Sequence, residues 1–153
     1  MKAVVQVVKE AAVLVKGNIV GKINKGLLVL LGVFDYDTKD NAELLAKKVS
    51  NLRVFTDEND KMNLSVLDIG GGVLTVSNFT ICADTSKGNR PSFINAMSPN
   101  EANNLYLHFI ECLKQNGVKK AEHGEFGADM KIDVSLDGPV TIVLDTDIWS
   151  KRK

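Results

Sequence analysis

The chain has 153 residues, 44% of them hydrophobic and 25% charged, and its 19 basic and 19 acidic residues give a formal net charge of zero. This composition is typical of one globular domain, and it excludes both a disordered tail and a protein that holds nucleic acid by overall charge. The longest apolar run, residues 26–34, is well short of the roughly 20 residues of a membrane-spanning helix, and no secretory signal precedes the first strand. We expect a cytoplasmic protein without a membrane partner, with one domain over residues 1–150 and a basic tail over residues 151–153.

Strands are predicted for the first 34 residues. Residues 3–8 and 11–15 are rich in β-branched side chains, residues 16–18 have the composition of a turn, and residues 19–23 form the returning strand. Residues 27–34 are apolar without alternation, which is typical of a central strand buried on both faces.

Two amphipathic helices interrupt the strands. The first follows Thr38, a predicted N-cap, and carries apolar residues at helical spacing. The second has the N-cap Ser98, Pro99 at its first position and Glu101 in place for a capping box, and it ends near Gly117.

Further strands are predicted at residues 73–79, 128–135 and 140–144, with a polar loop over residues 56–63. Residues 137–139 (Asp-Gly-Pro) break the last pair of strands, because proline donates no ladder hydrogen bond and glycine weakens a strand. Strands thus dominate both ends of the chain. We expect the α+β class, a largely antiparallel, barrel-like sheet with two amphipathic helices, and not an alternating βαβ fold.

Two familiar catalytic patterns are disfavoured. The glycines at 70–72 precede a strand and lack the lysine and hydroxyl residue of a phosphate loop, so a turn is expected there. His108 and His123 are the only histidines, and no Gly-x-Ser-x-Gly elbow accompanies them, which argues against a Ser-His-Asp triad. Cys82 and Cys112 have no metal-binding spacing, so we expect free thiols, no metal ion and no cofactor.

Three stretches carry more chemistry than ordinary loops. Residues 76–81 (Val-Ser-Asn-Phe-Thr-Ile) end a hydrophobic strand with hydroxyl and amide groups, and residues 87–93 (Lys-Gly-Asn-Arg-Pro-Ser-Phe) form a basic turn followed by an aromatic residue. Residues 124–130 (Gly-Glu-Phe-Gly-Ala-Asp-Met) place a phenylalanine between glycines, which permit close backbone approach.

With these stretches the chain resembles the D-aminoacyl-tRNA deacylase family, also called D-Tyr-tRNA deacylase. The resemblance is more specific than any single motif, because its segments follow one another in order over nearly the whole chain. The similar segments are residues 1–6, 26–33, 61–65, 83–84, 87–93, 126–130 and 137–141.

The resemblance implies hydrolysis of the ester that joins a D-amino acid to the terminal adenosine of tRNA. It also implies a homodimer in which a cis Gly138–Pro139 corner of one subunit projects into the pocket of the other and rejects L-residues by a clash. The partner is then the aminoacylated 3′ end of tRNA, and DNA is not expected. The implied site residues are Ser77, Asn78, Phe79 and Thr80 for catalysis, Gly138, Pro139, Phe126, Ala128 and Met130 for chiral selection, and Lys87 and Arg90 for tRNA binding.

Thr80 has two interpretations within this resemblance. Its hydroxyl either attacks or orients water, or it holds the strand end while the 2′-hydroxyl of the RNA assists. We favour the second, because no base lies beside Thr80 in the sequence and an unactivated hydroxyl is a weak nucleophile. The backbone N–H groups of Phe79 and Thr80 are then the candidates for stabilising the oxyanion.

Three positions depart from the usual family pattern: Val7 in place of arginine, Asn78 in place of glutamine and Leu136 in place of asparagine. They bear on the cis state of Pro139 and on the substrate range. Two alternatives therefore stay open: a non-catalytic module that binds the tRNA end, and a deacylase that edits a mischarged L- or achiral aminoacyl-tRNA.

Overall fold

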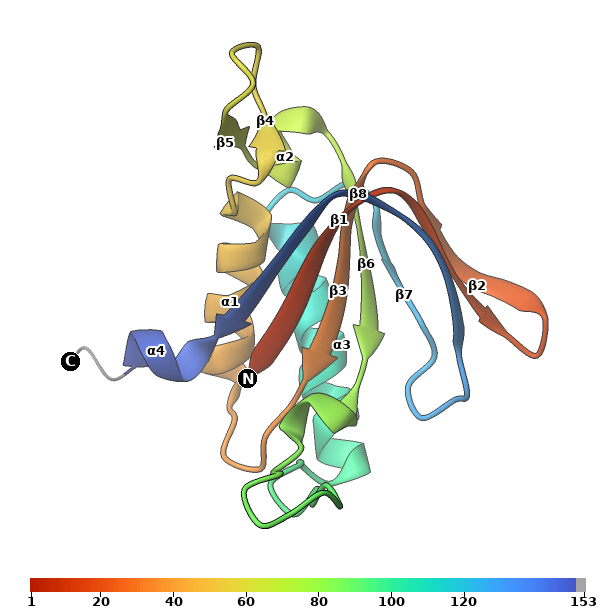
Figure 1. The fold of residues 1–153 in the computed structure, drawn as a ribbon, viewed down its shortest axis with the longest axis vertical. Helices are drawn as coiled ribbons and strands as arrows, with labels where there is room; N and C mark the ends of the chain where they lie inside the picture. Colours follow the sequence, from red (N-terminus) through yellow and green to blue (C-terminus); the bar gives the residue numbers. More distant parts are fainter. Residues whose placement is uncertain (151–153) are drawn as a thin grey trace.

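The computed structural model of the chain describes residues 1–150, which form a bent β-sheet with two long helices against it (Figure 1). Its elements in chain order are β1 (Lys2–Val15), β2 (Asn18–Ile23), β3 (Gly26–Gly32), α1 (Lys39–Asn51), β4 (Phe55–Thr56), β5 (Met62–Leu64), α2 (Val66–Ile69), β6 (Gly72–Ser77), the 3₁₀ turn η1 (Phe79–Cys82), α3 (Pro99–Gln115), β7 (Ala121–His123), β8 (Lys131–Asp145) and α4 (Thr146–Ser150). No helix within this part of the chain is both long and apolar enough to cross a membrane.

The long strand β1 lies at the centre of the sheet. It pairs antiparallel with β3 through residues 2–8, with β2 through residues 11–15, and with β8 along its other edge. β3 pairs parallel with β6, and β6 pairs parallel with β7. The predicted α+β class, with a largely antiparallel, barrel-like sheet and two amphipathic helices, is confirmed; the sequence does not indicate the two parallel pairings.

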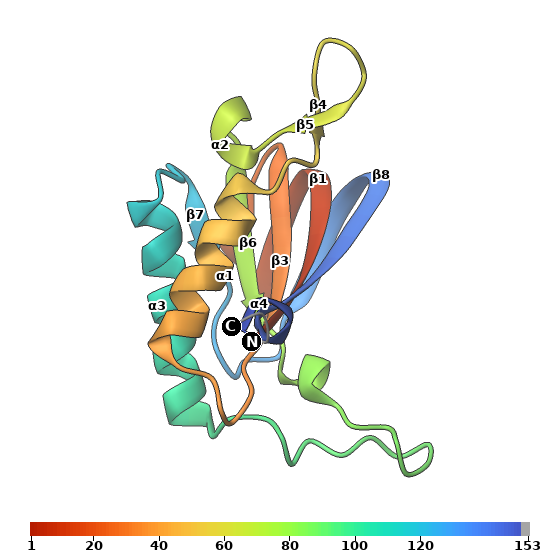
Figure 2. The same ribbon diagram turned by 90° about the vertical axis from the view of Figure 1, so that its left-hand side faces the viewer.

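Helices α1 and α3 connect the parallel strands and cover the same face of the sheet (Figure 2). Their apolar stripes and the facing strand residues form the larger core, in which Leu45, Tyr106 and Phe109 have almost no exposed surface. This core fixes the sheet against the helices and leaves the ends of the strands free to carry a site.

The N-caps of both helices are where the sequence predicts them. Thr38 is the N-cap of α1, and its N–H donates to the side-chain oxygen of Asn41 at 2.9 Å. Ser98 is the N-cap of α3, but its hydroxyl donates to the carboxylate of Glu101 at 3.3 Å and makes no backbone cap contact. The capping box predicted for this helix is therefore wrong.

A smaller core lies on the other face, where the sheet folds back on itself. β2 passes so close to β7 that a Cβ atom on Gly21 would lie 2.6 Å from the carbonyl oxygen of His123. Val8, Leu28 and Val76 belong to this buried cluster. Because β1 leaves β3 and continues with β2, the sheet curls into its barrel-like shape.

Several segments differ from their predicted form. The strands predicted for residues 3–8 and 11–15 are one continuous strand, and so are those on either side of residues 137–139. The strand predicted for residues 73–79 ends earlier, and Phe79 begins η1. The predicted polar loop, residues 56–63, lies within the β4–β5 hairpin. β7, α2 and α4 are too short to show a periodic pattern in the sequence.

Two predicted turns and the state of the cysteines are confirmed. Lys16 and Gly17, which join β1 to β2, have φ values of 51° and 81°. Gly70 ends α2 with a left-handed φ of 63° and Gly72 begins β6, so the predicted turn lies at Gly70 and Gly71 and is not a phosphate loop. Cys82 and Cys112 are free and buried.

A buried charge pair ties the first strand to the end of the described chain. The α-amino group of Met1 lies 2.5 Å from Oδ1 of Asp37 and donates to Oγ1 of Thr146 at 2.8 Å. The N–H of Phe34 donates to the second carboxylate oxygen at 2.7 Å. Burial raises the pKa of Asp37, and the amine and this N–H oppose the rise. The contacts join β1, the segment after β3 and α4.

Replacing Thr75 with valine is expected to raise the free energy of unfolding by about 1 kcal/mol. Thr75 lies in β6 without exposed surface, and its hydroxyl has no hydrogen-bond partner within residues 1–150. Valine keeps the shape and removes the uncompensated polar group. Denaturant titration measures the change, with Thr75→Ser as the control: it keeps the hydroxyl, loses a methyl group and should be less stable than the wild type. A destabilised Thr75→Val variant would contradict this account.

Candidate functional site

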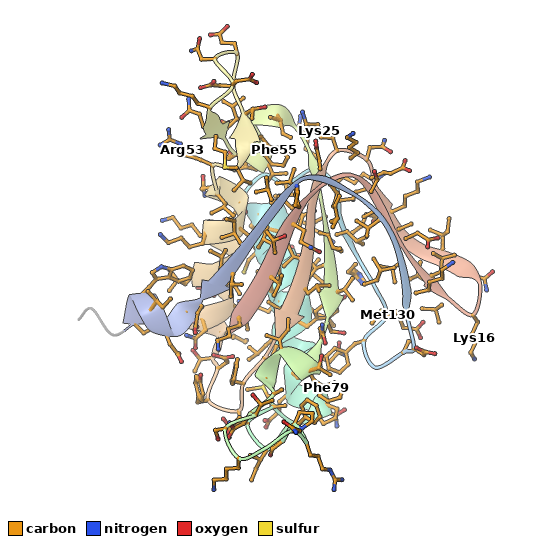
Figure 3. The ribbon with its side chains drawn as sticks, in the orientation of Figure 1. Lys16, Lys25, Arg53, Phe55, Phe79 and Met130 are labelled. Carbon is orange, nitrogen blue, oxygen red and sulfur yellow. The ribbon has the colours of Figure 1, made fainter. Side chains whose placement is uncertain are left out.

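A cavity of about 640 Å³ opens at the end of the sheet where β3 and β6 finish. Figure 3 shows two of its lining residues, Phe79 and Met130, at this end of the molecule, remote from the hairpin that carries Phe55. The lining residues are Leu31, Val33, Ser77, Asn78, Phe79, Phe93, Ala96, Met97, Ser98, Pro99, Ala102, Phe126, Gly127, Ala128 and Met130.

The cavity brings residues of all three predicted stretches together, since Phe93 of the 87–93 stretch also lines it. The predicted site residues in its wall are Ser77, Asn78, Phe79, Phe126, Ala128 and Met130. Those outside the wall are Thr80, Lys87, Arg90, Gly138 and Pro139. The sequence reasoning missed the apolar part of the lining, such as Leu31 and Met97, because a hydrophobic residue in a strand or before a helix carries no motif that marks it as part of a site.

Backbone contacts hold η1 at the mouth of the cavity. The N–H of Asn78 donates to the carbonyl of Leu31 at 2.8 Å, and the N–H of Ile81 donates to the carbonyl of Asn78 at 3.3 Å. The N–H groups of Phe79 and Thr80, which lie between them, have no partner within residues 1–150. They are therefore two adjacent free donors in the first turn of η1.

The far side of η1 is fixed by close packing against β3. A Cβ atom on Gly32 would lie 2.8 Å from Cβ of Ile81, so only glycine allows this approach. The thiol of Cys82 donates to the carbonyl of Val33 at 3.4 Å. Burial raises the pKa of this thiol to about 11, so that it stays protonated and structural.

The Thr80 side chain is exposed beside the cavity. Its hydroxyl lies 2.5 Å from the side-chain oxygen of Asn78 and donates to it. The proton of the hydroxyl is thus directed at an amide oxygen and not at a base. This contact fits a side chain that holds the turn.

The 124–130 stretch reaches the cavity from the opposite side. The hydroxyl of Tyr106 on α3 donates to the carbonyls of Thr75 and Gly124, at 3.0 and 3.3 Å, and links this stretch to β6. Burial raises the pKa of Tyr106. Its ring packs against Phe126 with 5.8 Å between ring centroids, and Gly127 turns the chain with a φ of 78°. The Phe126 ring is therefore held in a fixed place.

The Gly138–Pro139 corner lies away from the cavity of its own chain. Its peptide bond is cis, although Val7 stands where the family usually has arginine, and both residues are exposed. Leu136 pairs with Val8 and residue 141 with residue 6, whereas the cavity lies near the last residues of β3, opposite the start of β1. The corner thus sits several residues along the sheet from the cavity.

Lys87 and Arg90 lie in an exposed loop next to the cavity. Backbone hydrogen bonds between Asp84 and Ser92, at 2.8 and 2.9 Å, close the base of this loop. The carboxylate of Asp84 accepts the N–H of Ser86 at 2.9 Å, and hydrogen bonding to Ser86 holds the pKa of this carboxyl below its usual range. The loop is therefore fixed to the segment that carries Phe93.

The two histidines take part in other contacts. His108 pairs with Glu43 at 3.0 Å and lies 3.6 Å from the sulfur of Cys112, and His123 contacts the carbonyl of Gly124 at 2.7 Å. Neither contacts a serine or threonine hydroxyl within residues 1–150, in keeping with the expectation against a Ser-His-Asp triad.

The comparison with known proteins shows the family of the chain. The sequence matches the family model described as D-Tyr-tRNA(Tyr) deacylase over residues 4–145. The chain belongs to the D-Tyr-tRNA(Tyr) deacylase family. Residues 76–81, 87–93 and 124–130, singled out in the sequence, lie within the matched range, and so does the Gly138–Pro139 corner.

Several relatives in this family are similar over almost their whole length. The chain is 51% identical to a D-aminoacyl-tRNA deacylase of Clostridium botulinum, with 95% of this chain and 97% of that protein covered. It is 53% identical to a D-aminoacyl-tRNA deacylase of Fusobacterium nucleatum, with 95% and 96% covered.

Two solved structures have the same fold. One, named c-Myc DNA Unwinding Element Binding Protein, is 41% identical with a TM-score of 0.90, and the match covers 95% of this chain and 98% of that one. The other, described as a probable eukaryotic D-amino acid tRNA deacylase, is 16% identical with a TM-score of 0.78 and coverages of 94% and 98%. At that identity the second likeness concerns the fold alone.

Proposed function

We propose that the protein hydrolyses the ester bond of D-aminoacyl-tRNA and releases the free D-amino acid and tRNA. Membership of the deacylase family supports this activity. The observation that carries it is the meeting of residues 77–79 with residues 126–130 around one cavity of about 640 Å³. A cavity of this size holds a small ligand such as an aminoacyl group.

The reaction is an acyl transfer to water, in which the carbonyl oxygen of the ester gains negative charge. The unpartnered N–H groups of Phe79 and Thr80 supply two adjacent donors for this oxygen at the mouth of the cavity. Donors fixed in the ground state need no rearrangement as the charge develops, which is the source of their catalytic effect. The 2′-hydroxyl of the terminal ribose, which the substrate brings with it, assists the attack of water.

Replacing Thr80 with alanine is expected to lower kcat by about tenfold, the equivalent of one lost hydrogen bond, without abolishing hydrolysis. The hydroxyl donates to Asn78 at 2.5 Å and has no base to activate it, so its loss loosens η1 while the backbone donors stay. Single-turnover hydrolysis of D-Tyr-tRNA by Thr80→Ala, with Thr80→Ser as the control that keeps the hydroxyl, measures the effect. Complete loss of activity in a folded Thr80→Ala protein would identify Thr80 as the nucleophile or the water-orienting group.

The active form in this proposal is a homodimer, in which Gly138 and Pro139 of one subunit enter the cavity of the other. Both residues are exposed and lie away from their own cavity. Within residues 1–150 the outer edge of β8 has no neighbouring strand, and an open edge of this length is a ready pairing surface. The apolar side chains of Val134, Leu136 and Val143 are 39%, 44% and 63% exposed along it, which favours burial against a second copy.

In this dimer the main chain at the Gly138–Pro139 corner distinguishes a D- from an L-amino acid in the substrate. Carbonyl oxygens of the partner's Gly138 and its neighbours accept hydrogen bonds from the ammonium group of the substrate and fix the direction of its Cα substituents. A D-side chain points into open space, whereas an L-side chain meets the backbone and is rejected. Glycine has no side chain to clash, so a glycyl ester is only weakly excluded.

The deciding experiment follows ester loss from D-Tyr-tRNA, L-Tyr-tRNA and Gly-tRNA. Release from the D-ester, alone or with the glycyl ester, is expected. Retained tRNA binding without release would instead identify a binding module, and release from the L-ester would identify an editor of mischarged L-aminoacyl-tRNA. Light scattering on the same sample tests the dimer, and a monomer with full activity would refute the cross-subunit corner.

The RNA contacts in this proposal come from Lys87 and Arg90 beside the cavity. The substrate of the family makes tRNA the proposed partner, and a net charge of zero favours a local contact over one spread across the whole surface. The basic tail, residues 151–153, lies outside the described residues. A substrate that takes part in translation places the enzyme in the cytoplasm.

A further inference from the structure

Two aromatic side chains at the mouth of the cavity, one exposed and one half-buried, are not used by the proposed reaction. The side chain of Phe79 is 60% exposed, and its ring meets Phe93 edge to face, with 5.0 Å between centroids and 72° between planes. Both residues line the cavity, and Figure 3 shows Phe79 beside the loop at this end of the molecule. We call this pair the aromatic lip. An apolar ring left in water at a site entrance offers a face to another flat group.

A basic group stands next to the aromatic lip. Lys87 and Arg90, here called the basic tip, are exposed, and neither forms an ion pair within residues 1–150. The paired backbones of Asp84 and Ser92 fix this tip, and Phe93 follows Ser92 directly in the chain. The tip and the lip are thus parts of one ordered segment and not two unrelated surface features.

We propose that the aromatic lip and the basic tip form a subsite for the unpaired nucleotides that precede the terminal adenosine at the acceptor end. This inference rests on the proposed function. A base of these nucleotides stacks on the lip, and their phosphates lie against Lys87 and Arg90. Aromatic stacking with backbone charge contacts is the usual way in which proteins hold single-stranded nucleic acid, and it tolerates any base because every base has a π-face.

The subsite has two consequences for the substrate. It recognises single-stranded RNA, because base faces are available for stacking only where the strand is unpaired. It also extends the contact beyond the esterified nucleoside, but it does not contact the base-paired part of the tRNA. A substrate cut back to the terminal nucleoside therefore loses the contribution of lip and tip and keeps that of the cavity.

The test compares two esters, D-Tyr-tRNA and D-tyrosine esterified to adenosine alone. For each enzyme variant we take the ratio of kcat/KM for D-Tyr-tRNA to kcat/KM for the adenosine ester. This ratio measures how much the nucleotides before the adenosine contribute to kcat/KM. We expect Phe93→Leu to lower this ratio about tenfold, since one stacked base is lost, and Phe93→Tyr to keep it. Lys87→Ala with Arg90→Ala should lower it by a similar factor and make KM for the tRNA less dependent on salt.

The matched control removes two lysines from α1, Lys39 and Lys47, which are exposed and lie on another element. This variant changes the net charge equally and should leave the ratio unchanged. An equal loss on both esters, or no loss on either, in Phe93→Leu would overturn the subsite. A change of oligomeric state in Phe93→Leu would overturn it too, because the lip would then belong to a subunit interface.

A binding measurement keeps the test independent of catalysis. Fluorescence anisotropy of a labelled CCA trinucleotide that carries no amino acid measures binding to the subsite, even if neither ester is hydrolysed. Weaker binding by about tenfold in Phe93→Leu supports the subsite, and unchanged binding refutes it. Failure of the wild type to hydrolyse either ester, with trinucleotide binding that depends on Phe93, would refute the proposed function and leave the subsite standing.

Discussion

Gly138→Ala is expected to lower kcat/KM for D-Tyr-tRNA by about a hundredfold or more while the protein stays folded. Gly138 has a φ of 124°, which L-residues rarely adopt, and an added Cβ atom would lie 2.8 Å from both Cγ2 and N of Val140. The corner must therefore shift to accept the methyl group. In the proposed dimer the shifted atoms are the carbonyl groups that hold the substrate ammonium in the partner's cavity. A displacement of about 1 Å in such a group is enough for this loss.

Gly17→Ala is the matched control for this change. Gly17 also has a positive φ, 81°, but nothing lies within 4 Å of an added Cβ atom, and it sits in the β1–β2 turn. Both variants place alanine at a positive φ, but only Gly138→Ala displaces the corner, so only that variant should lose activity. Full activity in Gly138→Ala would contradict the role of the corner.

Mixing two inactive variants tests whether the corner acts across subunits. Gly138→Ala combined with a cavity variant such as Phe126→Ala should regain activity, because one of the two mixed cavities then has an intact wall and an intact corner. Lack of recovery in mixtures that form heterodimers would indicate that each corner serves its own chain.

The parts of the site that are contiguous in the sequence could be predicted from it. Hydroxyl and amide groups at a strand end, and a phenylalanine between glycines, are visible in residues 76–81 and 124–130, and both stretches do line the cavity. Their meeting could not be read from spacing. It depends on the parallel pairing of β6 with β7, and β7 has only three residues, Ala121–His123, without β-branched side chains.

The position of the corner is the part that sequence patterns could not supply. Its distance from the cavity follows from the register of β8 on β1, where the pairing shifts between Gln6 and Val8. Between these pairs β1 advances by two residues (6 to 8) and β8 by five (141 to 136), so β8 carries three extra residues, and such unequal spacing leaves no periodic signal. The exposed state of Phe79 is likewise a result of η1, a turn that replaces the end of the predicted strand. The aromatic lip therefore appears only in the folded protein.

Gly26→Ala is expected to lower the free energy of unfolding by more than about 4 kcal/mol, a loss large enough to unfold many domains. Residue 26 pairs with Val8 of β1 and with Gly72 of β6, at the place where β1 leaves β3 and the sheet begins to curl. An added Cβ atom would lie 1.9 Å from the carbonyl oxygen of Gly72, and this neighbour is backbone that cannot rotate away. Strand propensity alone predicts the opposite sign, a gain of about 0.5–1 kcal/mol, but it is too small to offset such an overlap.

Gly70→Ala separates overlap from backbone strain in this test. Gly70 has a left-handed φ of 63°, and an added Cβ atom there meets nothing within 4 Å. Strain alone should cost about 1–2 kcal/mol. Denaturant titrations of both variants compare the two effects, and soluble expression of Gly26→Ala gives a first reading. A Gly26→Ala protein as stable as Gly70→Ala would mean that β3 and β6 can move apart at this point, and that the curl of the sheet does not depend on their close approach.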